Sequence, residues 1–260
     1  MDTRSETRVV KDVEREVEIA ASPDAVWQAL TDAHELTRWF PMDARVVPGV
    51  GGSITMQWQG EPPLHSRIEI WMPSHHLRMA GLGGLDDLVT DIFLEGRGGS
   101  TTLRLVTSGF GTDANWDNII EGFQKGWDFE LLGLKHYLER HRGADRVIAR
   151  ARLEIAEYEP AWNRLIQSGE WFPTDLRPGD HFSIRAGHVA IEGTVQVWSP
   201  PRQMVGVVNG WNDALTRVTL FCVDQIGSIT AWLSAYDVPE SEVRALERAW
   251  QASLVRILQE

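Results

Sequence analysis

The sequence has little of three features that would each define a class of protein. It contains one cysteine, Cys222, so no disulfide can form within the chain and a reducing, cytoplasmic setting is expected. No apolar run approaches the roughly 18–20 residues of a membrane-spanning helix. Residues 1–18 are charged and lack an apolar core, so a signal peptide is not expected either.

Positive charge is also scarce. Lys and Arg number 25 against 37 Asp and Glu, which gives a net charge of -12. Nucleic acids and anionic membranes are bound through basic surfaces, and the chain has no block of basic residues. We therefore predict that neither is a partner. The 43% of hydrophobic residues is typical of a folded globular protein.

A short aromatic motif occurs twice. "RWFP" (38–41) returns as "EWFP" (170–173), and both copies continue with Asp, Pro-Gly and Ser-Ile in the same order. The strands and helices predicted around the motif also recur in one order. An ordered internal repeat indicates a duplicated structural unit.

Alternation of apolar residues predicts the strands, and helical spacing predicts the helices. In each copy a strand and a helix precede the motif, and several antiparallel strands and a long helix follow it. Ser22 is the expected N-cap of the first helix, with Pro23 at its first position. The expected strands are 13–20, 53–58, 66–73, 77–81 and two within 88–109, answered by 151–157, 181–186, 193–200, 203–207 and two within 216–237. The long helices are expected at 115–141 and 239–260.

Four stretches carry a family resemblance: "VEIAASPDAVWQALTD", "RWFP", "IEIWMPSHHL" and "EGFQKGW". They resemble the SRPBCC superfamily, also called START-related or helix-grip proteins. Within it they resemble homologues of the activator of the ninety-kilodalton heat-shock-protein ATPase, in which a Gly-Trp pair such as Gly126-Trp127 precedes spaced leucines. The resemblance covers residues 12–141 and is weaker afterwards, where Ala249 replaces the glycine.

The repeat and the resemblance together predict an α+β fold. We expect two tandem helix-grip domains, each a curved antiparallel sheet wrapped around a long C-terminal helix, because the last helix carries the only long apolar stripe that can cover the sheet. The expected boundaries are a flexible tail at 1–11, a first domain at 12–142 and a second, diverged domain at 143–260.

The resemblance implies a ligand cavity between sheet and helix, where members bind sterols, lipids, plant hormones or polyketides. Strand parity predicts the lining, and we expect the larger cavity in the first domain because Gly122 and Gly126 leave room on its helix. Packing of an ordinary core would explain the same positions. The predicted ligand-binding residues are Trp39, Phe40, Met56, Trp58, Ser66, Ile68, Ile70, Thr90, Ile92, Leu103, Thr107, Phe123, Trp127 and Leu131.

This lining offers almost no acid–base chemistry, which general acid–base catalysis requires close to the substrate. Parity places His65, Arg67, Asp91 and Arg104 on the other face, although a β-bulge would reverse the parity. No catalytic residue is therefore assigned. The main hypothesis is binding of a small hydrophobic or aromatic ligand. The alternatives are an enzyme of the polyketide cyclase/aromatase or hydratase type and a chaperone-activator-like protein-interaction module.

Other motifs predict no metal or cofactor. His75 and His76 are adjacent, and neighbouring side chains usually diverge, so no metal site is expected. The glycines of "GLGGLDD" (81–87) lack the Lys-Ser/Thr of a phosphate loop. Cys222 has inward parity and is interpreted as a packing residue.

Three tryptophans, Trp71, Trp198 and Trp232, alternate out of phase with the apolar residues of their strands. They should therefore lie on the convex face of each sheet, where exposed rings would form an apolar patch that monomers usually avoid. We predict that at least two of them pack in a domain–domain contact or in a homodimer.

Overall fold

The computed structural model describes residues 11–81, 85–111, 115–223 and 226–259. The chain divides into two compact units, residues 1–143 and 144–260. Among the helices described, none is long and apolar enough to cross a membrane.

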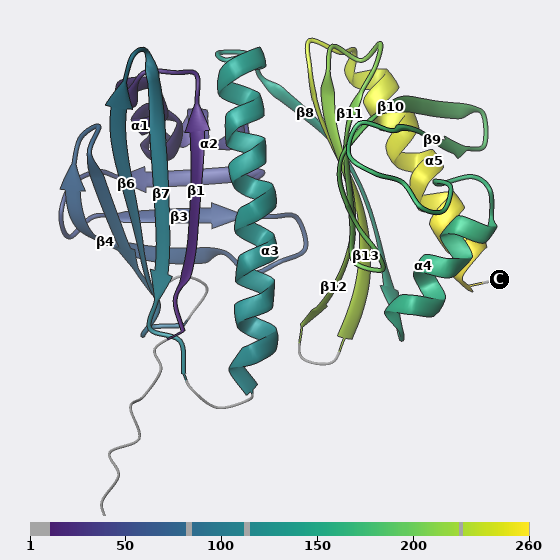
Figure 1. The fold of residues 1–260 in the computed structure, drawn as a ribbon, viewed down its shortest axis with the longest axis horizontal. Coiled ribbons are helices and arrows are strands. Elements are labelled where there is room, and N and C mark those ends of the chain that lie inside the picture. The colour runs from purple at the N-terminus through teal and green to yellow at the C-terminus, as the bar shows by residue number, and fades with distance from the viewer. Residues whose placement is uncertain (1–10, 82–84, 112–114, 224–225, 260) are drawn as a thin grey trace, which may run out of the picture. The chain divides into compact units, whose positions relative to one another are not determined.

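The first unit is a seven-stranded antiparallel sheet with a long helix, α3, alongside it (Figure 1). Strand order is β1-β7-β6-β5-β4-β3-β2. The elements are β1 (Val13–Ile19), α1 (Pro23–Thr31), α2 (Ala33–Thr37), β2 (Asp43–Val47), β3 (Ser53–Gln57), β4 (Leu64–Met72), β5 (His76–Ala80), β6 (Val89–Arg97), β7 (Ser100–Ser108), α3 (Asn115–His136) and one π-helical turn, η2 (Tyr137–His141).

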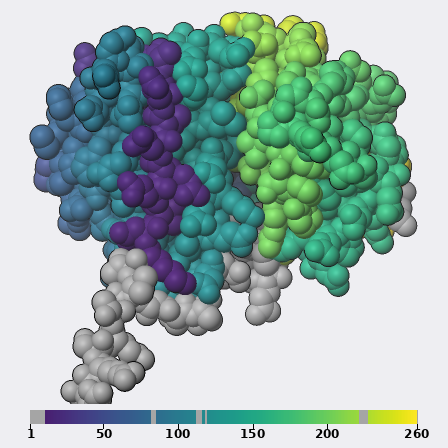
Figure 2. Space-filling model, in the orientation of Figure 1, coloured from purple at the N-terminus to yellow at the C-terminus, as the bar shows by residue number. Residues whose placement is uncertain are grey.

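Local sequence explains the start of this unit. Strand β1 alternates as expected: Val13 and Ile19 are buried and its glutamates are exposed, and the strand lies open at the surface as the purple band in Figure 2. Ser22 caps α1 by accepting a hydrogen bond from the Ala25 N–H at 3.3 Å, and Pro23 begins the helix.

The second unit repeats the plan with six strands, in the order β8-β13-β12-β11-β10-β9, and the helix α5 lies against the sheet (Figure 1). The fold class predicted from the sequence is therefore confirmed. The elements are β8 (Arg146–Ile155), α4 (Tyr158–Gln167), β9 (His181–Ala186), β10 (Val189–Ser199), β11 (Gln203–Val208), β12 (Ala214–Val223), β13 (Ile226–Tyr236) and α5 (Glu240–Gln259).

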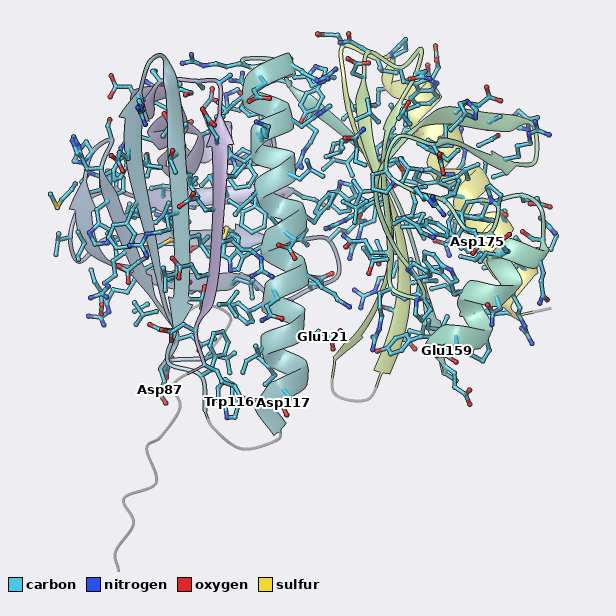
Figure 3. The ribbon with its side chains drawn as sticks, in the orientation of Figure 1. Asp87, Trp116, Asp117, Glu121, Glu159 and Asp175 are labelled. Atoms are coloured by element: carbon cyan, nitrogen blue, oxygen red, sulfur yellow. The ribbon has the colours of Figure 1, made fainter. Side chains whose placement is uncertain are left out.

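The two copies differ at one edge of the sheet. Strand β2, which the sequence did not predict, pairs with β3 and forms the edge of the first sheet. The corresponding segment of the second unit, two residues shorter, forms no strand. It contains Asp175, which is labelled in Figure 3 and has a φ of 60°. As a result β9, the counterpart of β3, is itself an edge strand.

The opposite edge of the second sheet is fastened to α5. Gln251 accepts the backbone N–H of Arg152 at 3.0 Å and donates its amide to the carbonyl of the same residue at 3.1 Å. Glu247 accepts the N–H of Arg150 at 3.1 Å, and Arg244 donates to the carbonyl of Ile148 at 3.1 Å. These side chains satisfy the backbone of β8, which would otherwise be an open edge.

The prediction that Trp71 and Trp198 lie on the convex face is wrong. Strand β4 has a register shift between Ile68 and Ile70, and β10 has one between Val195 and Val197. One extra residue reverses the parity of everything after it, so both rings turn inward.

Each of these rings then packs within its own unit. Trp71 meets Trp27 of α1 edge-on, with ring centroids 5.0 Å apart. Trp198 lies 5.4 Å from both Trp162 of α4 and Phe172. The two rings therefore join sheet to first helix in both copies.

Trp232 does face away from the inner core, because its neighbours Ala231 and Leu233 belong to that core. It pairs across the sheet with Arg150 and Arg217. The guanidinium carbons of Arg146, Arg150 and Arg217 lie 5.5 to 5.9 Å from its ring, so cation–π contacts stabilise it. Its part in a domain contact or a dimer stays a prediction.

Candidate functional site

The concave face of the first unit holds most of the residues predicted to bind a ligand. Phe40, Trp58 and Phe123 are half-buried. Those buried on the sheet, the helix and the aromatic loop are Trp39, Met56, Ser66, Ile68, Thr90, Ile92, Leu103, Thr107, Trp127 and Leu131.

Four aromatic rings from three parts of the unit meet at one end of this face. Phe40 stacks on Trp39, with centroids 5.0 Å apart, and lies 5.3 Å from Trp58 and 6.0 Å from Trp127 of α3. The repeated aromatic motif thus connects the end of β3 to the long helix. Burial and mutual stacking of these rings stabilise the loop.

A second aromatic group involves Phe123. Its ring lies 5.3 Å from Phe110, which in turn lies 6.0 Å from Trp116. Trp116 is at the first turn of α3 (Figure 3). Phe123 therefore packs toward the N-terminal end of the helix, away from the cluster around Phe40.

Two buried polar groups of the predicted lining have no hydrogen-bond partner among the residues that the structure describes. They are the Ser66 hydroxyl on β4 and the indole N–H of Trp127 on α3. By contrast, the hydroxyls of Thr90 and Thr107 bond each other at 3.1 Å. A buried polar group left unpaired costs about 1–3 kcal/mol, so these two positions favour a ligand atom that would pair with them.

One predicted lining residue faces the other way. The bulge in β4 places Ile70 opposite Arg78, and Arg78 shares a face with Asp91. Ile70 therefore lies on the convex side, and the prediction for this residue is wrong. Since the bulge comes after Ser66 and Ile68, their inward parity is unchanged.

The convex face carries the titratable residues, as parity predicted. Arg78 grips Asp91 with two hydrogen bonds of 2.9 and 2.8 Å, and His76 Nε2 lies 2.7 Å from the same carboxylate. The ring of Phe93 stacks on that of His76, with centroids 4.3 Å apart, and the guanidinium carbon of Arg104 lies 4.5 Å from the centroid of the Phe93 ring. This polar cluster is separated from the concave lining by the sheet.

The carboxylate of Asp91 is the buried charge of this cluster, with its side chain 8% exposed. Burial acts to raise its pKa, but the hydrogen bonds from Arg78 and His76 outweigh burial and hold the pKa below its usual value. A depressed carboxyl pKa stabilises the fold above the unfolded pKa of about 4, and this stabilisation is lost as the pH falls through the folded value.

We expect Asp91→Asn to lower the free energy of unfolding by about 1–3 kcal/mol at neutral pH. The difference from the wild type should begin to shrink below about pH 4, where the unfolded carboxyl takes up a proton, and should vanish as the pH falls through the lower pKa of the folded carboxylate. Urea unfolding at pH 7 and pH 3 measures both values. Glu14→Gln, in an exposed pair with Arg104, is the control and should change little. An equal loss for Asp91→Asn at both pH values would contradict this assignment.

No group of metal-ligating side chains occurs among the residues that could be searched. His76 is engaged by Asp91, and His75 Nδ1 lies 2.9 Å from the carbonyl of Pro73. Gly83, Gly84 and the side chain of Cys222 lie outside the described residues, so the interpretations of the glycine segment and of the cysteine stay predictions.

Sequence reasoning missed a tie between the aromatic loop and the end of the helix. The Tyr137 hydroxyl donates to Glu35 at 2.7 Å and accepts the N–H of Gly143 at 3.0 Å. Burial, together with Glu35, raises the pKa of Tyr137. Glu35 also pairs with Arg38, directly before the aromatic motif. A tyrosine in an apolar helix pattern gave no signal of this role.

Two hollows are found on the part of the chain that the structure describes, and only the smaller of them touches the predicted lining, at Ser66. The smaller, about 520 Å³, is in the first unit and is lined by Ser66, His65, Arg67, Asp86 and residues near Gly52 and Gly81. The larger, about 1010 Å³, is in the second unit, between α5 and the end of β9. This is contrary to the prediction that the first domain holds the larger space.

Residues 20–139 match the family described as "Activator of Hsp90 ATPase homolog 1-like protein". The resemblance stated from the sequence is therefore confirmed for the first unit. No curated protein sequence matches the chain.

Several solved structures are similar at low sequence identity. The Aha1 dimer from Colwellia psychrerythraea is 21% identical over 51% of this chain and 99% of its own, with a TM-score of 0.46. The di-domain ARO/CYC BexL of the BE-7585A biosynthetic pathway is 14% identical over 95% of this chain and 96% of its own, with a TM-score of 0.46. DynU16, described as a putative protein of the dynemicin biosynthetic locus, is 16% identical over 95% of this chain and 96% of its own, with a TM-score of 0.43. At such low sequence identities, neither a ligand nor a reaction of these proteins can be assigned to this chain.

Proposed function

We propose that the first unit binds a small, largely apolar or aromatic molecule carrying one hydrogen-bonding group. The observation that carries the proposal is a pair of buried polar groups on the predicted lining, the Ser66 hydroxyl and the Trp127 indole N–H, which find no partner in the described part of the chain. Both residues are more than nine-tenths buried. Ligand sites commonly combine apolar walls with a few such polar groups.

Access to this interior is proposed from the smaller hollow, because Ser66 forms part of its wall. At the other end the half-buried ring of Phe40 lies 6.0 Å from Trp127 and 5.3 Å from Trp58. A ligand would contact apolar side chains along its body and place its polar atom near Ser66 or Trp127.

Binding without catalysis is favoured over an enzyme of the cyclase or hydratase type. The convex cluster holds Asp91, His76 and Arg78 on the far side of the sheet. Among the described lining residues the polar groups are hydroxyls and indoles, and none of these is a useful base near neutral pH.

The test uses 2-naphthol and its apolar analogue 2-methylnaphthalene. Trp127→Phe keeps an aromatic ring but removes the N–H donor. We expect the affinity for 2-naphthol to fall roughly fivefold to tenfold, the value of one hydrogen bond, while that for 2-methylnaphthalene is unchanged. Calorimetry gives the affinities, and amide chemical shifts locate the site.

The control is Trp250→Phe, which makes the same change at the matching position of the second unit and should leave both affinities as they are. If neither compound binds the first unit saturably, or if Trp127→Phe weakens both equally, the proposal is wrong.

A protein-interaction role is the second candidate, favoured by the family match over residues 20–139. It predicts no saturable binding of either naphthalene compound in the first unit. The same titration therefore separates the two candidates.

A further inference from the structure

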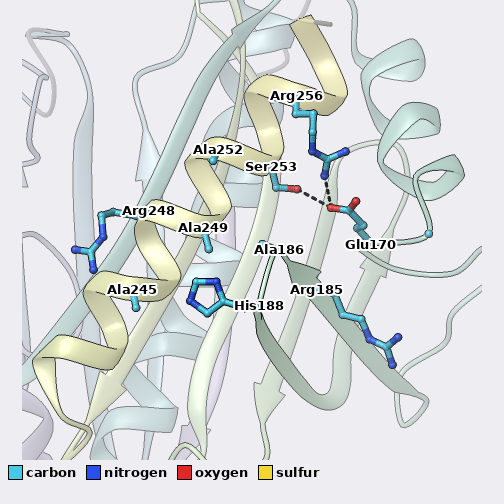
Figure 4. Close-up of a pocket in the computed structure, with 12 residues that line it drawn as sticks. Glu170, Arg185, Ala186, His188, Ala245, Arg248, Ala249, Ala252, Ser253 and Arg256 are labelled. Atoms are coloured by element: carbon cyan, nitrogen blue, oxygen red, sulfur yellow. Dashed lines mark hydrogen bonds and ion pairs between the residues drawn. The ribbon is translucent and has the colours of Figure 1, made fainter.

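The larger hollow of the second unit is a groove with a basic rim. Figure 4 shows it between α5 and the end of β9. Its lining residues are Gly169, Glu170, Arg185, Ala186, Gly187, His188, Ala245, Arg248, Ala249, Ala252, Ser253 and Arg256.

Most of the groove's lining lies outside the core of this unit, although Ala186 in its floor belongs to the core. The core face of α5 carries Val243, Leu246, Trp250 and Leu254, and the flank with Gln251 is bonded to β8. The remaining flank, with Ala245, Ala249 and Ala252, faces the groove. Because α5 is fastened to one edge of the sheet, space remains beside β9 at the other edge, where the second unit has no counterpart of β2.

Changes between the two copies explain why this site is hollow. Aligning Trp127 with Trp250 puts Ala252 at the place of Phe129, and aligning Ile54 with Ile184 puts His188 at the place of Trp58. Two large aromatic residues of the first copy are thus replaced by one small and one basic residue. A groove of about 1010 Å³ is large enough for a small organic ligand.

The rim is positive although the whole chain has a net charge of -12. Three arginines and one histidine line the groove against one carboxylate, Glu170. Glu170 is already engaged, because it accepts hydrogen bonds from Arg256 and, at 3.1 Å, from the Ser253 hydroxyl. Arg185 and Arg248 are exposed and have no acidic partner among the described residues.

The positions and the chemistry of the side chains that line the groove fit an anionic ligand with an apolar body. Arg248 and Arg256 are two turns apart on α5, about 12 Å along its axis, and His188 points toward the alanine flank (Figure 4). Guanidinium groups bind carboxylates through paired hydrogen bonds, while the alanines offer a flat apolar floor. We propose that this groove binds an organic anion with a carboxylate and a flat apolar body. The proposal does not rest on the interior of the first unit.

The test compares 2-naphthoate with neutral 2-naphthamide on the full chain. We expect 2-naphthoate to shift amide signals of α5 and of the β9–β10 turn, with weaker binding at higher salt. The double variant Arg185→Gln with Arg248→Gln should raise the Kd about tenfold or more. Arg177→Gln, an exposed arginine of the same unit outside the groove, is the matched control and should leave the Kd unchanged.

A second variant tests the hollow rather than the charge. Ala252→Phe restores the residue of the first copy and should abolish binding while the protein remains folded by circular dichroism. Equal affinity for acid and amide, no effect of the arginine variants, no effect of Ala252→Phe, or shifts confined to the first unit would each overturn the proposal.

Discussion

Trp250→Ala should lower the free energy of unfolding of the second unit by about 3–5 kcal/mol, the usual loss when a buried aromatic side chain is removed from a core. Trp250 is fully buried on the inner face of α5, and its ring lies 6.0 Å from that of Trp171. Both rings belong to one continuous core that runs from the sheet to α4 and α5. Close-packed surroundings cannot collapse fully into the space left by an indole.

The measurement is urea unfolding followed by circular dichroism, with hydrogen exchange to assign the loss to α5, β8 and β13. Trp250→Phe is the matched control. It keeps an aromatic ring and removes an indole N–H that has no partner among the described residues, so the loss should be much smaller. A loss below about 1.5 kcal/mol for Trp250→Ala would mean that the core is not close-packed around this ring.

The repeat made the architecture predictable from the sequence. Paired tryptophans, such as Trp127 with Trp250, fixed the alignment of the two copies, and one apolar stripe per copy fixed which helix covers the sheet. β9 occupies 181–186 as predicted, whereas β8 begins five residues before the predicted 151. Where a strand ends depends on its pairing with neighbouring strands, and the residues of the strand alone do not determine that pairing.

The two β-bulges show why parity failed after Ile68 and Val195. An inserted residue such as Glu69 leaves the alternation of residue types intact, so the strand reads as regular. The signal was nevertheless present, since Trp71 and Trp198 are out of phase with their strands in both copies. A large aromatic residue on the wrong face twice at the same place is better explained by a bulge than by two exposed rings.

The sequence predicted which face of the sheet a candidate residue lies on, but not how much space remains next to it. Parity identified the buried concave residues, yet the space between a sheet and a helix depends on the side chains that fill it. The positive charge of the groove in the second unit could also not be predicted from the net charge of -12. Its basic residues come from β9, a turn and α5 and come together only in the folded protein.

Gly206→Ala should lower the free energy of unfolding by about 1–3 kcal/mol, the loss typical of overpacking a filled core. A Cβ at Gly206 would meet three ring atoms of Phe182 at 2.3, 3.0 and 3.0 Å. Phe182 lies fully buried on β9 and pairs directly with Gly193 of the next strand. The ring therefore occupies the space over two glycines.

The physical cause is tested by a double-mutant cycle. If the methyl group clashes with the ring, shortening the ring side chain with Phe182→Leu should remove most of the loss caused by Gly206→Ala, and the two changes should not be additive. Gly210→Ala cannot serve as the control for a glycine-to-alanine exchange, because Gly210 has a φ of 74° and an alanine there would add backbone strain. Ala190→Gly, on an exposed residue of β10, reports instead what a glycine–alanine exchange is worth without a clash. Additive losses in the cycle would show that the penalty comes from the backbone of β11 and not from Phe182.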